Sequence, residues 1–392
     1  MKKVKLSELG EIVGGSTPST KDSQNYDGNI SWITPKDLAN YNKIYIKSGE
    51  RSITEKGFNS CSTKMLPRNS ILFTSRAPIG YIAIASNELC TNQGFKSIIP
   101  NNKINYLFLY YLLKYNKDYI ASFGSGTTFK EVSGTVMKNI EVSIPDTIEE
   151  QRKIANILYT IDQKIELNNQ INDNLHELAE QQFIKIYNSG NEKTLGNLLD
   201  NISTGSRPKG GAQSIGIPSV GAEKIEKFGV YDYSSEKFIS EDFYKKLKNG
   251  KMKSGDVLLY KDGAYTGKVS MCLNGFPHKE SAVNEHVFIL NTKDNWAQNY
   301  LYFTLYNKEN KEMLEKLAGS KAAQPGLNQG ELKSLKIKIC AKEIIENFEA
   351  NVKPIMENIA NNSLENKKLA ELRDTLLPKL MNGEIELDKI IL

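Results

Sequence analysis

Cysteine, histidine and long apolar runs are scarce in this sequence of 392 residues. The four cysteines, Cys61, Cys90, Cys272 and Cys340, are far apart, with no CxxC pair and no histidine at metal-ligand spacing. This pattern argues against a zinc site or a disulfide framework and favours reduced thiols. No run of 18 apolar residues occurs, so no transmembrane helix is expected. The amino terminus, MKKVKLSELGEIVGG, lacks the apolar core of a signal peptide. We therefore predict a cytoplasmic protein that contacts no membrane.

Motifs that carry catalysis are also missing. Gly263–Lys268 has one residue too few between its glycines for a phosphate-binding loop, and Val269 follows where that loop has a hydroxyl residue. There is no Asn-Pro-Pro-aromatic motif of an amino-methyltransferase and no GxGxxG loop after a strand. The only histidines are His176, His278 and His286, which suggest no nucleophile–base pair. We predict that this chain has no catalytic residue, no metal site and no cofactor of its own.

The charge balance is mildly basic. Lys and Arg number 51 against 46 Asp and Glu, which gives a net charge of +5 and a pI near 8.7. Such a balance permits nucleic-acid binding without requiring it, so any DNA-binding charge must be placed locally. With 39% hydrophobic residues, the chain has enough apolar material for two or three domains.

The sequence contains an internal repeat. MLPRNSILF (residues 65–73) matches MKSGDVLLY (252–260), 187 residues later, and Gly80 matches Gly267 at the same offset. NQGFKSII (92–99) resembles NEHVFIL (284–290) at an offset of 192, and Gly124 matches Gly319 at 195. The drifting offset indicates loops of different length between equivalent segments. The chain is therefore predicted to be a duplicated unit.

The strongest part of the repeat is helical. Residues 149–187 and 343–381 both carry a stripe that advances by alternating steps of four and three, a heptad pattern. Two unrelated amphipathic helices, each packed on its own domain, are the alternative, but polar breaks at matching places favour partner helices. His176 also lies on the first helix, where we expect it to be solvated. The predicted seam is Ile154, Leu158, Ile161, Ile165, Asn168 and Asn172 with Phe348, Val352, Ile355, Ile359, Asn362 and Asn366.

Connectivity predicts how the two helices pair. The first leaves one globular part for the other and the second returns, so the pair is antiparallel, with Asn168 level with Asn366 and Asn172 level with Asn362. The predicted organisation is a globular part at 1–148, a helix at 149–187, a globular part at 188–342, and a helix with a tail at 343–392. The fold class is α+β: two tandem mixed α/β parts and two long helices forming an antiparallel coiled coil.

Shorter elements are predicted inside the globular parts. Strand-like runs lie at Ser70–Thr74, Tyr81–Ala85, Val257–Tyr260 and Val287–Leu290, each ended by Gly, Pro or Asn turns. Residues 106–115 and 297–307 are predicted to be aromatic-rich helices. Their aromatic side chains fit a core better than a platform for stacking bases.

Several stretches along nearly the whole chain form a recognisable set. They are KLSELGEIVGGSTPS, ISWITPKDL, SRAPIGYIAI, TNQGFKSIIP, GTTFKEVSG with MKNIEVSIP, EEQRKIANIL and LRDTLLPKLMNGEIEL. Together they resemble a known family, the specificity subunits of type I restriction-modification systems. Each glycine-containing piece is weak alone, but their order, spacing and duplication make the resemblance specific. The second half departs from it, since GAYTGK stands in place of SRAPIG and Gly210-Gly211-Ala212 follows STGSRP.

The resemblance implies a function and partners. The globular parts would be target recognition domains, each reading one half of a split sequence in double-stranded DNA. The helices and adjoining surfaces would dock two modification subunits, which methylate adenine with S-adenosylmethionine. Restriction subunits, which translocate DNA with ATP and Mg²⁺, would join that core. All three cofactors would belong to the partners.

Two polar loops occupy equivalent places in the repeat, just after strand-like segments. They read GGSTPSTK (residues 14–21) and STGSRPK (203–209). Glycine lets a phosphate approach the backbone, hydroxyls donate to it, and Lys or Arg neutralises it. A polar surface turn is the alternative for either loop alone, but recurrence favours DNA binding. We predict DNA contacts at Thr17, Lys21, Thr204, Arg207 and Lys209.

Further candidates lie beside the ends of predicted strands. Arg or Lys suits guanine, and Asn or Gln suits adenine, although these side chains could equally hold the loops together. The candidates near base edges are Arg76, Asn92, Gln93, Lys96, Lys261, Lys268, Asn284 and His286. Lys130 and Lys321 are predicted phosphate contacts.

Two other functions remain open at this point. One is a free-standing nuclease or methyltransferase with unfamiliar motifs, which activity assays on the purified chain would reveal. The other is a coiled-coil adaptor without DNA specificity, which binding in the presence of random competitor DNA would reveal. The seam from Ile154 to Ile186 implies a helix of roughly 50 Å. If the helices set the distance between half-sites, the unspecified spacer is roughly 5–8 base pairs.

Overall fold

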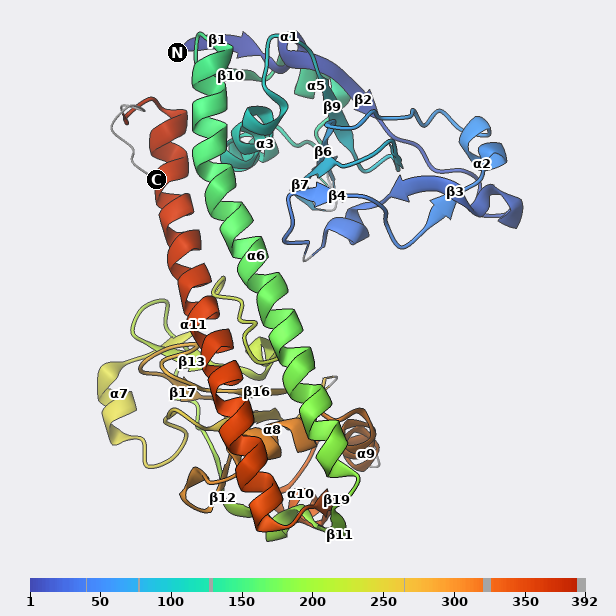
Figure 1. Ribbon diagram of the computed structural model, residues 1–392. Coiled ribbons are helices and arrows are strands. Elements are labelled where there is room, and N and C mark those ends of the chain that lie inside the picture. The colour runs from blue at the N-terminus through green and yellow to red at the C-terminus, as the bar shows by residue number, and fades with distance from the viewer. Residues whose placement is uncertain (40, 77, 127–129, 264, 320–325, 386–392) are drawn as a thin grey trace. The chain divides into compact units, whose positions relative to one another are not determined.

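The computed structural model describes the chain except residues 40, 77, 127–129, 264, 320–325 and 386–392 (Figure 1). The chain forms two compact units, each described here by itself. The first unit comprises Met1–Glu166 and Leu369–Leu392, and the second comprises Leu167–Lys368. The unit boundaries fall inside two long helices, α6 (Ile148–Tyr187) and α11 (Lys342–Met381). Each unit therefore contains one globular part and a section of both helices.

The globular part of the first unit is built on a sheet in the order β2-β9-β6-β7-β4. A smaller sheet, β5-β3-β8, and a two-stranded ribbon, β1-β10, complete its described strands. Its strands are β1 (Lys2–Lys5), β2 (Gly10–Gly14), β3 (Tyr26–Ile33), β4 (Tyr45–Ile46), β5 (Ser52–Ile53), β6 (Ile71–Ser75), β7 (Ile79–Ala85), β8 (Cys90–Thr91), β9 (Lys96–Pro100) and β10 (Glu141–Ile144). Its short α-helices are α1 (Leu6–Leu9), α2 (Glu55–Asn59), α3 (Tyr106–Tyr115), α4 (Lys117–Ser122) and α5 (Gly134–Asn139).

The second unit repeats this plan. Its largest sheet has the order β12-β18-β15-β16, beside a smaller sheet β14-β13-β17 and a ribbon β11-β19. Its strands are β11 (Asn191–Thr194), β12 (Leu199–Thr204), β13 (Ile217–Val220), β14 (Phe238–Ile239), β15 (Val257–Tyr260), β16 (Val269–Met271), β17 (Ala282–Val283), β18 (Val287–Thr292) and β19 (Lys336–Ile339). Its short α-helices are α7 (Glu241–Lys246), α8 (Gln298–Tyr306), α9 (Lys308–Gly319) and α10 (Gln329–Ser334).

The topology confirms the duplication that the sequence predicts. The order β2-β9-β6-β7 is matched by β12-β18-β15-β16, and in both units the small sheet contains one parallel pair, β3 with β8 and β13 with β17. The repeated segments 65–73 and 252–260 end in the equivalent strands β6 and β15. The predicted strand and helix runs also form, α3 and α8 included. The first unit differs in having β4 at the sheet edge.

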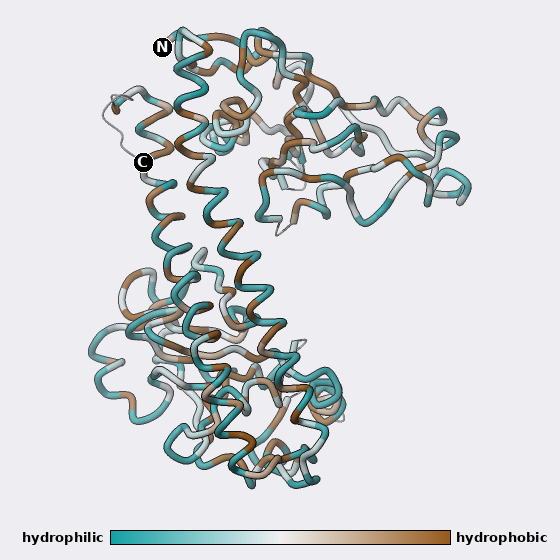
Figure 2. Tube along the Cα trace, viewed as in Figure 1, coloured by the Kyte–Doolittle hydropathy of each residue, from teal (hydrophilic) through white to brown (hydrophobic). Residues whose placement is uncertain are grey.

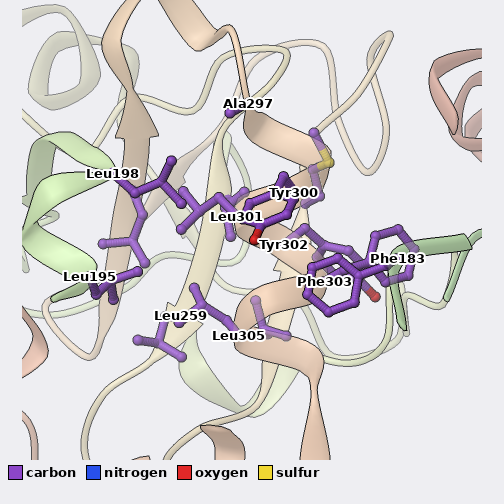
Figure 3. Close-up of a cluster of buried hydrophobic side chains, with 14 of the residues drawn as sticks. Phe183, Leu195, Leu198, Leu259, Ala297, Tyr300, Leu301, Tyr302, Phe303 and Leu305 are labelled. Carbon is purple, nitrogen blue, oxygen red and sulfur yellow. The ribbon is translucent and has the colours of Figure 1, made fainter. Parts of the chain in front are cut away.

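Aromatic residues fill the core of the second unit. Tyr300, Tyr302 and Phe303 on α8 are buried against Phe183 on α6 (Figure 3). Several of these rings meet edge to face, a favourable geometry for aromatic pairs. In the first unit, Phe108 and Tyr111 on α3 are likewise buried in one cluster. The prediction that these helices supply core rather than exposed stacking platforms is confirmed.

The two long helices pack antiparallel. In the second unit, Asn168 Nδ2 donates to Asn366 Oδ1 at 2.9 Å, and Asn362 Nδ2 donates to Asn172 Oδ1 at 2.9 Å. Both asparagine pairs are those the heptad registers predict. In the first unit, Arg373 Nη1 donates to Asp162 Oδ1 at 2.7 Å. Residues later in α6 thus contact residues earlier in α11, as an antiparallel pair requires. Figure 2 shows apolar and polar residues alternating along both helices.

The predicted seam positions lie on one side of each helix. Ile154, Leu158, Ile161, Asn168 and Asn172 are buried, as are Phe348, Val352 and Ile359, whereas Ile165, Ile355, Asn362 and Asn366 are half-buried. The helix α6 begins at a capping box, in which Thr147 Oγ1 accepts from Glu150 N and Glu150 Oε2 accepts from Thr147 N. A cap at Thr147 explains why the helix starts where the heptad pattern starts.

One expectation for α6 is wrong. His176 is not solvated but only 3% exposed, and its Nε2 lies 2.8 Å from the Tyr302 hydroxyl. Its ring contacts Phe303 and Tyr306 as well. Burial lowers the pKa of His176 to about 4, because the charged imidazolium loses its hydration. The heptad pattern places His176 next to the seam rather than on it, so the pattern does not indicate that it is buried. In the structure, the globular part of the second unit covers this side of α6.

Candidate nucleic-acid interface

In the first unit, three loops meet at one end of the largest sheet. The loop after β2 passes close to the turn before β9: Ser16 N donates to Thr91 O at 3.0 Å, and Thr17 Oγ1 donates to the side-chain oxygen of Gln93. A side chain at Gly15 would lie 2.1 Å from the Asn92 carbonyl, so this approach requires glycine. The segment after β6 joins them, because Ser75 N donates to Gly94 O at 2.8 Å.

Charged side chains gather on these loops. Glu131 accepts contacts from both Arg76 Nη1, at 3.5 Å, and Lys96 Nζ, at 3.2 Å. The Arg76 side chain remains 34% exposed and that of Glu131 36%. The structure therefore brings together Thr17, Arg76, Asn92, Gln93 and Lys96. Asn92 also has a local role, since its Oδ1 accepts from Gly94 N at 2.9 Å.

The second unit assembles the same three loops. A side chain at Gly205 would lie 1.6 Å from the Val283 carbonyl, which is the approach made by Gly15 in the first unit. Thr204 Oγ1 donates to Val287 O at 2.9 Å, and Asn284 Oδ1 accepts from His286 N at 2.9 Å. Lys261 N donates to His286 O at 3.1 Å, the counterpart of the Ser75–Gly94 bond. Thr204, Lys261, Asn284 and His286 therefore share one end of the sheet.

Three predicted cations of the second unit, and His286, lie beside carboxylates. Arg207 Nη2 is 3.1 Å from Glu285, and Lys261 Nζ is 3.1 Å from Asp262. His286 lies between both acids, with Nδ1 3.1 Å from Asp262 and Nε2 3.4 Å from Glu285. Lys268 pairs with Glu226, and its ammonium lies 4.8 Å from the centroid of the Tyr265 ring. Tyr265 is itself 62% exposed.

The remaining predicted contacts lie apart from these ion pairs. Lys21, Lys130 and Lys209 are exposed and form no salt bridge with any residue that the structure describes. An exposed ammonium of this kind can neutralise a phosphate without the fixed geometry that a base contact requires. Lys321 lies outside the described residues.

Sequence reasoning missed the acids and the exposed ring. Glu131, Asp262 and Glu285 each stand beside a predicted DNA contact in the chain (Lys130, Lys261 and His286), and this was the only available signal. Arg76 and Glu131 are 55 residues apart, and only folding brings them together. Tyr265 sits between Gly263 and Gly267, both with positive φ, a pattern that indicates a tight exposed turn.

Among the described residues, no group of three or more His, Cys, Asp or Glu side chains is placed to hold a metal ion. No helix in the described part of the chain is long and apolar enough to cross a membrane. The side chains at both edges offer hydrogen bonds and charge. Such groups suit binding to a nucleic acid, whose phosphates are anionic and whose base edges differ in donors and acceptors.

Comparison with known proteins identifies the family. Residues 1–177 match the family described as "Type I restriction modification DNA specificity domain". The chain is 35% identical to the type I restriction enzyme MjaIX specificity subunit of Methanocaldococcus jannaschii, over 98% of this chain and 94% of that protein. It is 29% identical to the EcoR124I/EcoR124II specificity subunit of Escherichia coli over 45% of each chain.

A solved structure shares the fold. The type I restriction-modification S subunit of M. genitalium superposes with a TM-score of 0.61 at 17% identity, covering 97% of this chain and 95% of that one. Identity this low shows the fold alone. The relationship to the M. jannaschii protein, in contrast, extends over nearly the whole of both sequences. The chain therefore belongs to the family of type I restriction-modification specificity subunits, the DNA target-recognition components of those systems.

Proposed function

We propose that the two globular parts, 1–148 and 188–342, each read one half of a bipartite DNA target. The observation that supports this most strongly is the duplicated edge. In each unit a glycine-bearing loop, the turn before β9 or β18, and the segment after β6 or β15 converge and carry cations and amides. A core-forming repeat alone would not require the polar loops to recur at equivalent places.

The chain acts through partners in this proposal. Two modification subunits, supplying S-adenosylmethionine-dependent adenine methylation, dock on the helices and adjoining surfaces. ATP- and Mg²⁺-dependent restriction subunits join them. This chain contributes recognition and positioning only, in keeping with the absence of a catalytic motif in its sequence. The purified chain alone is therefore expected neither to cleave nor to methylate DNA, and activity abolished by mutating one of its own residues would contradict the proposal.

Exchange of one globular part tests whether each part reads its own half of the target. Residues 1–148 are replaced by the first part of another family member, and methylation-sensitive sequencing of host DNA reads the target before and after. One half of the target should change while the other half stays the same. Exchange of 188–342 is the matched control and should change the opposite half. A change in both halves after either exchange would show that the two parts do not read independently.

A further inference from the structure

The two edges contain one backbone position that makes the same two backbone contacts in each unit but carries opposite charge. In the first unit, Val132 N donates to Ser75 O at 3.0 Å, and Arg76 forms an antiparallel bridge with Glu131. In the second, Leu327 N donates to Lys261 O at 2.8 Å, and Asp262 forms the same bridge with Gly326. Both Val132 and Leu327 are buried. Arg76 and Asp262 therefore occupy the same place in the two folds, 186 residues apart. The offset of 187 predicted from the sequence is one too large for this segment, because the register pairs Ile71 with Ile98 and Val257 with Leu290.

The neighbours of this position are exchanged along with its charge. In the first unit Glu131 balances Arg76. In the second unit Gly326 takes the place of Glu131, and a side chain there would lie 2.7 Å from Asp262 Oδ1. Instead, Lys261 Nζ and the His286 ring contact Asp262, and these two residues replace Ser75 and Gly94. Three surrounding positions thus differ between the units together with this charge, which a mere surface turn would not demand.

Both side chains keep capacity for another partner. Among the described residues, the Arg76 side chain forms one ion pair, at 3.5 Å, and a guanidinium has five N–H donors in a planar fork. The contacts of Asp262 with Lys261 and His286 both fall on Oδ2, while the side chain is 23% exposed. An arginine fork matches the O6 and N7 acceptors of guanine, and a carboxylate accepts from the N4 amino group of cytosine.

We propose that Arg76 and Asp262 are equivalent specificity-determining residues, Arg76 reading guanine in one half-site and Asp262 reading cytosine in the other. This inference rests on the proposed function, since it assigns atoms to the recognition proposed above. Both residues select a G·C base pair, but Arg76 contacts the guanine of its pair and Asp262 contacts the cytosine of its pair. The two readings can therefore be separated by changing single atoms of the DNA.

The experiment uses the full-length chain assembled with its modification subunits. Bound duplexes are first selected from a randomised library to define both half-sites. Arg76→Gln should replace one G·C pair by A·T in one half-site, because Gln suits adenine. Asp262→Asn should do the same in the other half-site only. Arg76→Lys keeps the charge but loses the fork, so selection at the same pair should weaken, whereas a residue that only neutralises phosphate would leave every position unchanged.

Base analogues then identify the atom that is read. Substituting 7-deazaguanine, which lacks N7, at the pair read by Arg76 should weaken binding roughly 5- to 100-fold, the range expected for one good base contact. The same substitution at the pair read by Asp262 should change binding less than about 2-fold, because cytosine carries that contact. Equal effects at both pairs would overturn the inference.

Matched variants keep the result interpretable. Arg68→Gln changes an arginine that lies before β6 rather than after it, and Asp242→Asn changes an aspartate on α7. Both variants should leave the selected DNA sequence unchanged. The unfolding midpoint of every variant shows whether it folds. A split sequence that neither Arg76→Gln nor Asp262→Asn alters would overturn this inference and leave the proposed function intact. Failure of the unmutated complex to select any sequence would overturn both.

Discussion

His176 shows how burial decides the chemistry of one residue. Its ring nitrogen lies beside the Tyr302 hydroxyl, and the same hydroxyl accepts from Phe228 N at 3.2 Å. A neutral imidazole satisfies this site, whereas an imidazolium would be charged in an apolar cluster of rings. The pKa of His176 is therefore lowered to about 4 in the folded chain, against about 6.5 when unfolded.

Stability should consequently fall as the solution is acidified. Below pH 6.5 the unfolded chain takes up a proton that the folded chain refuses until about pH 4, so the contribution is complete above pH 6.5 and is lost towards pH 4. His176→Gln keeps a hydrogen-bonding group but does not titrate. Between pH 7 and 5 the unmutated chain should lose about 2 kcal/mol more unfolding free energy than this variant, measured by denaturant titration.

Comparison with the variant is needed because another buried group opposes His176. Burial raises the pKa of the Glu349 carboxyl to about 7, and its oxygens accept from Tyr300 N and Asn299 Nδ2. A raised carboxyl pKa favours the folded state at low pH, the reverse of the His176 effect. Glu349 is present in both proteins and cancels in the difference. Identical pH profiles for the two proteins would contradict the assignment to His176.

Lys130 tests the phosphate contacts. It is exposed and unpaired among the described residues, so Lys130→Ala should weaken binding to all sequences about equally. The slope of log K against log salt should become shallower by roughly one unit, since one fewer counterion is released. Lys321→Ala carries the same prediction. Lys103→Ala, at an exposed lysine before α3, is the control, and a loss confined to one base position would instead assign Lys130 to base reading.

At the scale of the element, polar pairs fix how α6 and α11 meet. Asn172 donates to Ser363 Oγ at 3.1 Å and accepts from Asn362. Ser363 in turn donates to Gly229 O at 2.7 Å, which ties the seam to a loop of the globular part. Polar groups at a seam cost stability but penalise every other register, because a slipped pair would leave them buried without partners.

A double-mutant cycle measures this pair. Asn172→Leu or Asn362→Leu alone should cost about 1–3 kcal/mol of unfolding free energy, because each leaves a partner without its hydrogen bond. The double variant should cost about 1 kcal/mol less than the sum of the two. Asn174→Leu, exposed on the same helix, should change stability by less than about 0.5 kcal/mol. Strict additivity would show that the pair contributes no specific coupling.

At the scale of the whole molecule, the prediction concerns the spacer between half-sites. Inserting one heptad into each long helix adds about 10 Å to each. If the helices set the spacing, the preferred spacer should lengthen by about three base pairs, at about 3.4 Å per base pair. Methylation-sensitive sequencing measures the spacer, and the half-site sequences should stay unchanged as an internal control. An unaltered spacer would show that the length of the helices does not set the distance between half-sites.

The sequence by itself determined the elements whose signal is local or periodic. Residues 149–187 and 343–381 were predicted as helices, and α6 and α11 occupy Ile148–Tyr187 and Lys342–Met381. A heptad stripe without glycine interruption leaves little choice of structure, and repetition at nearly fixed offset shows duplication whatever the fold. The asparagine pairs followed from the same register, because an antiparallel alignment of the two seams brings Asn168 level with Asn366 and Asn172 level with Asn362.

Only the tertiary structure decided which side chains neighbour the predicted DNA contacts. Asp262 and His286 are 24 residues apart, and His176 and Tyr302 are 126 apart, so no window along the chain contains both members. Their encounter depends on strand order and on which face of α6 the globular part covers, neither of which has a local signal. For that reason the sequence predicted loops that meet at each sheet edge, while the opposite charges of Arg76 and Asp262 at one shared position emerged only from the fold.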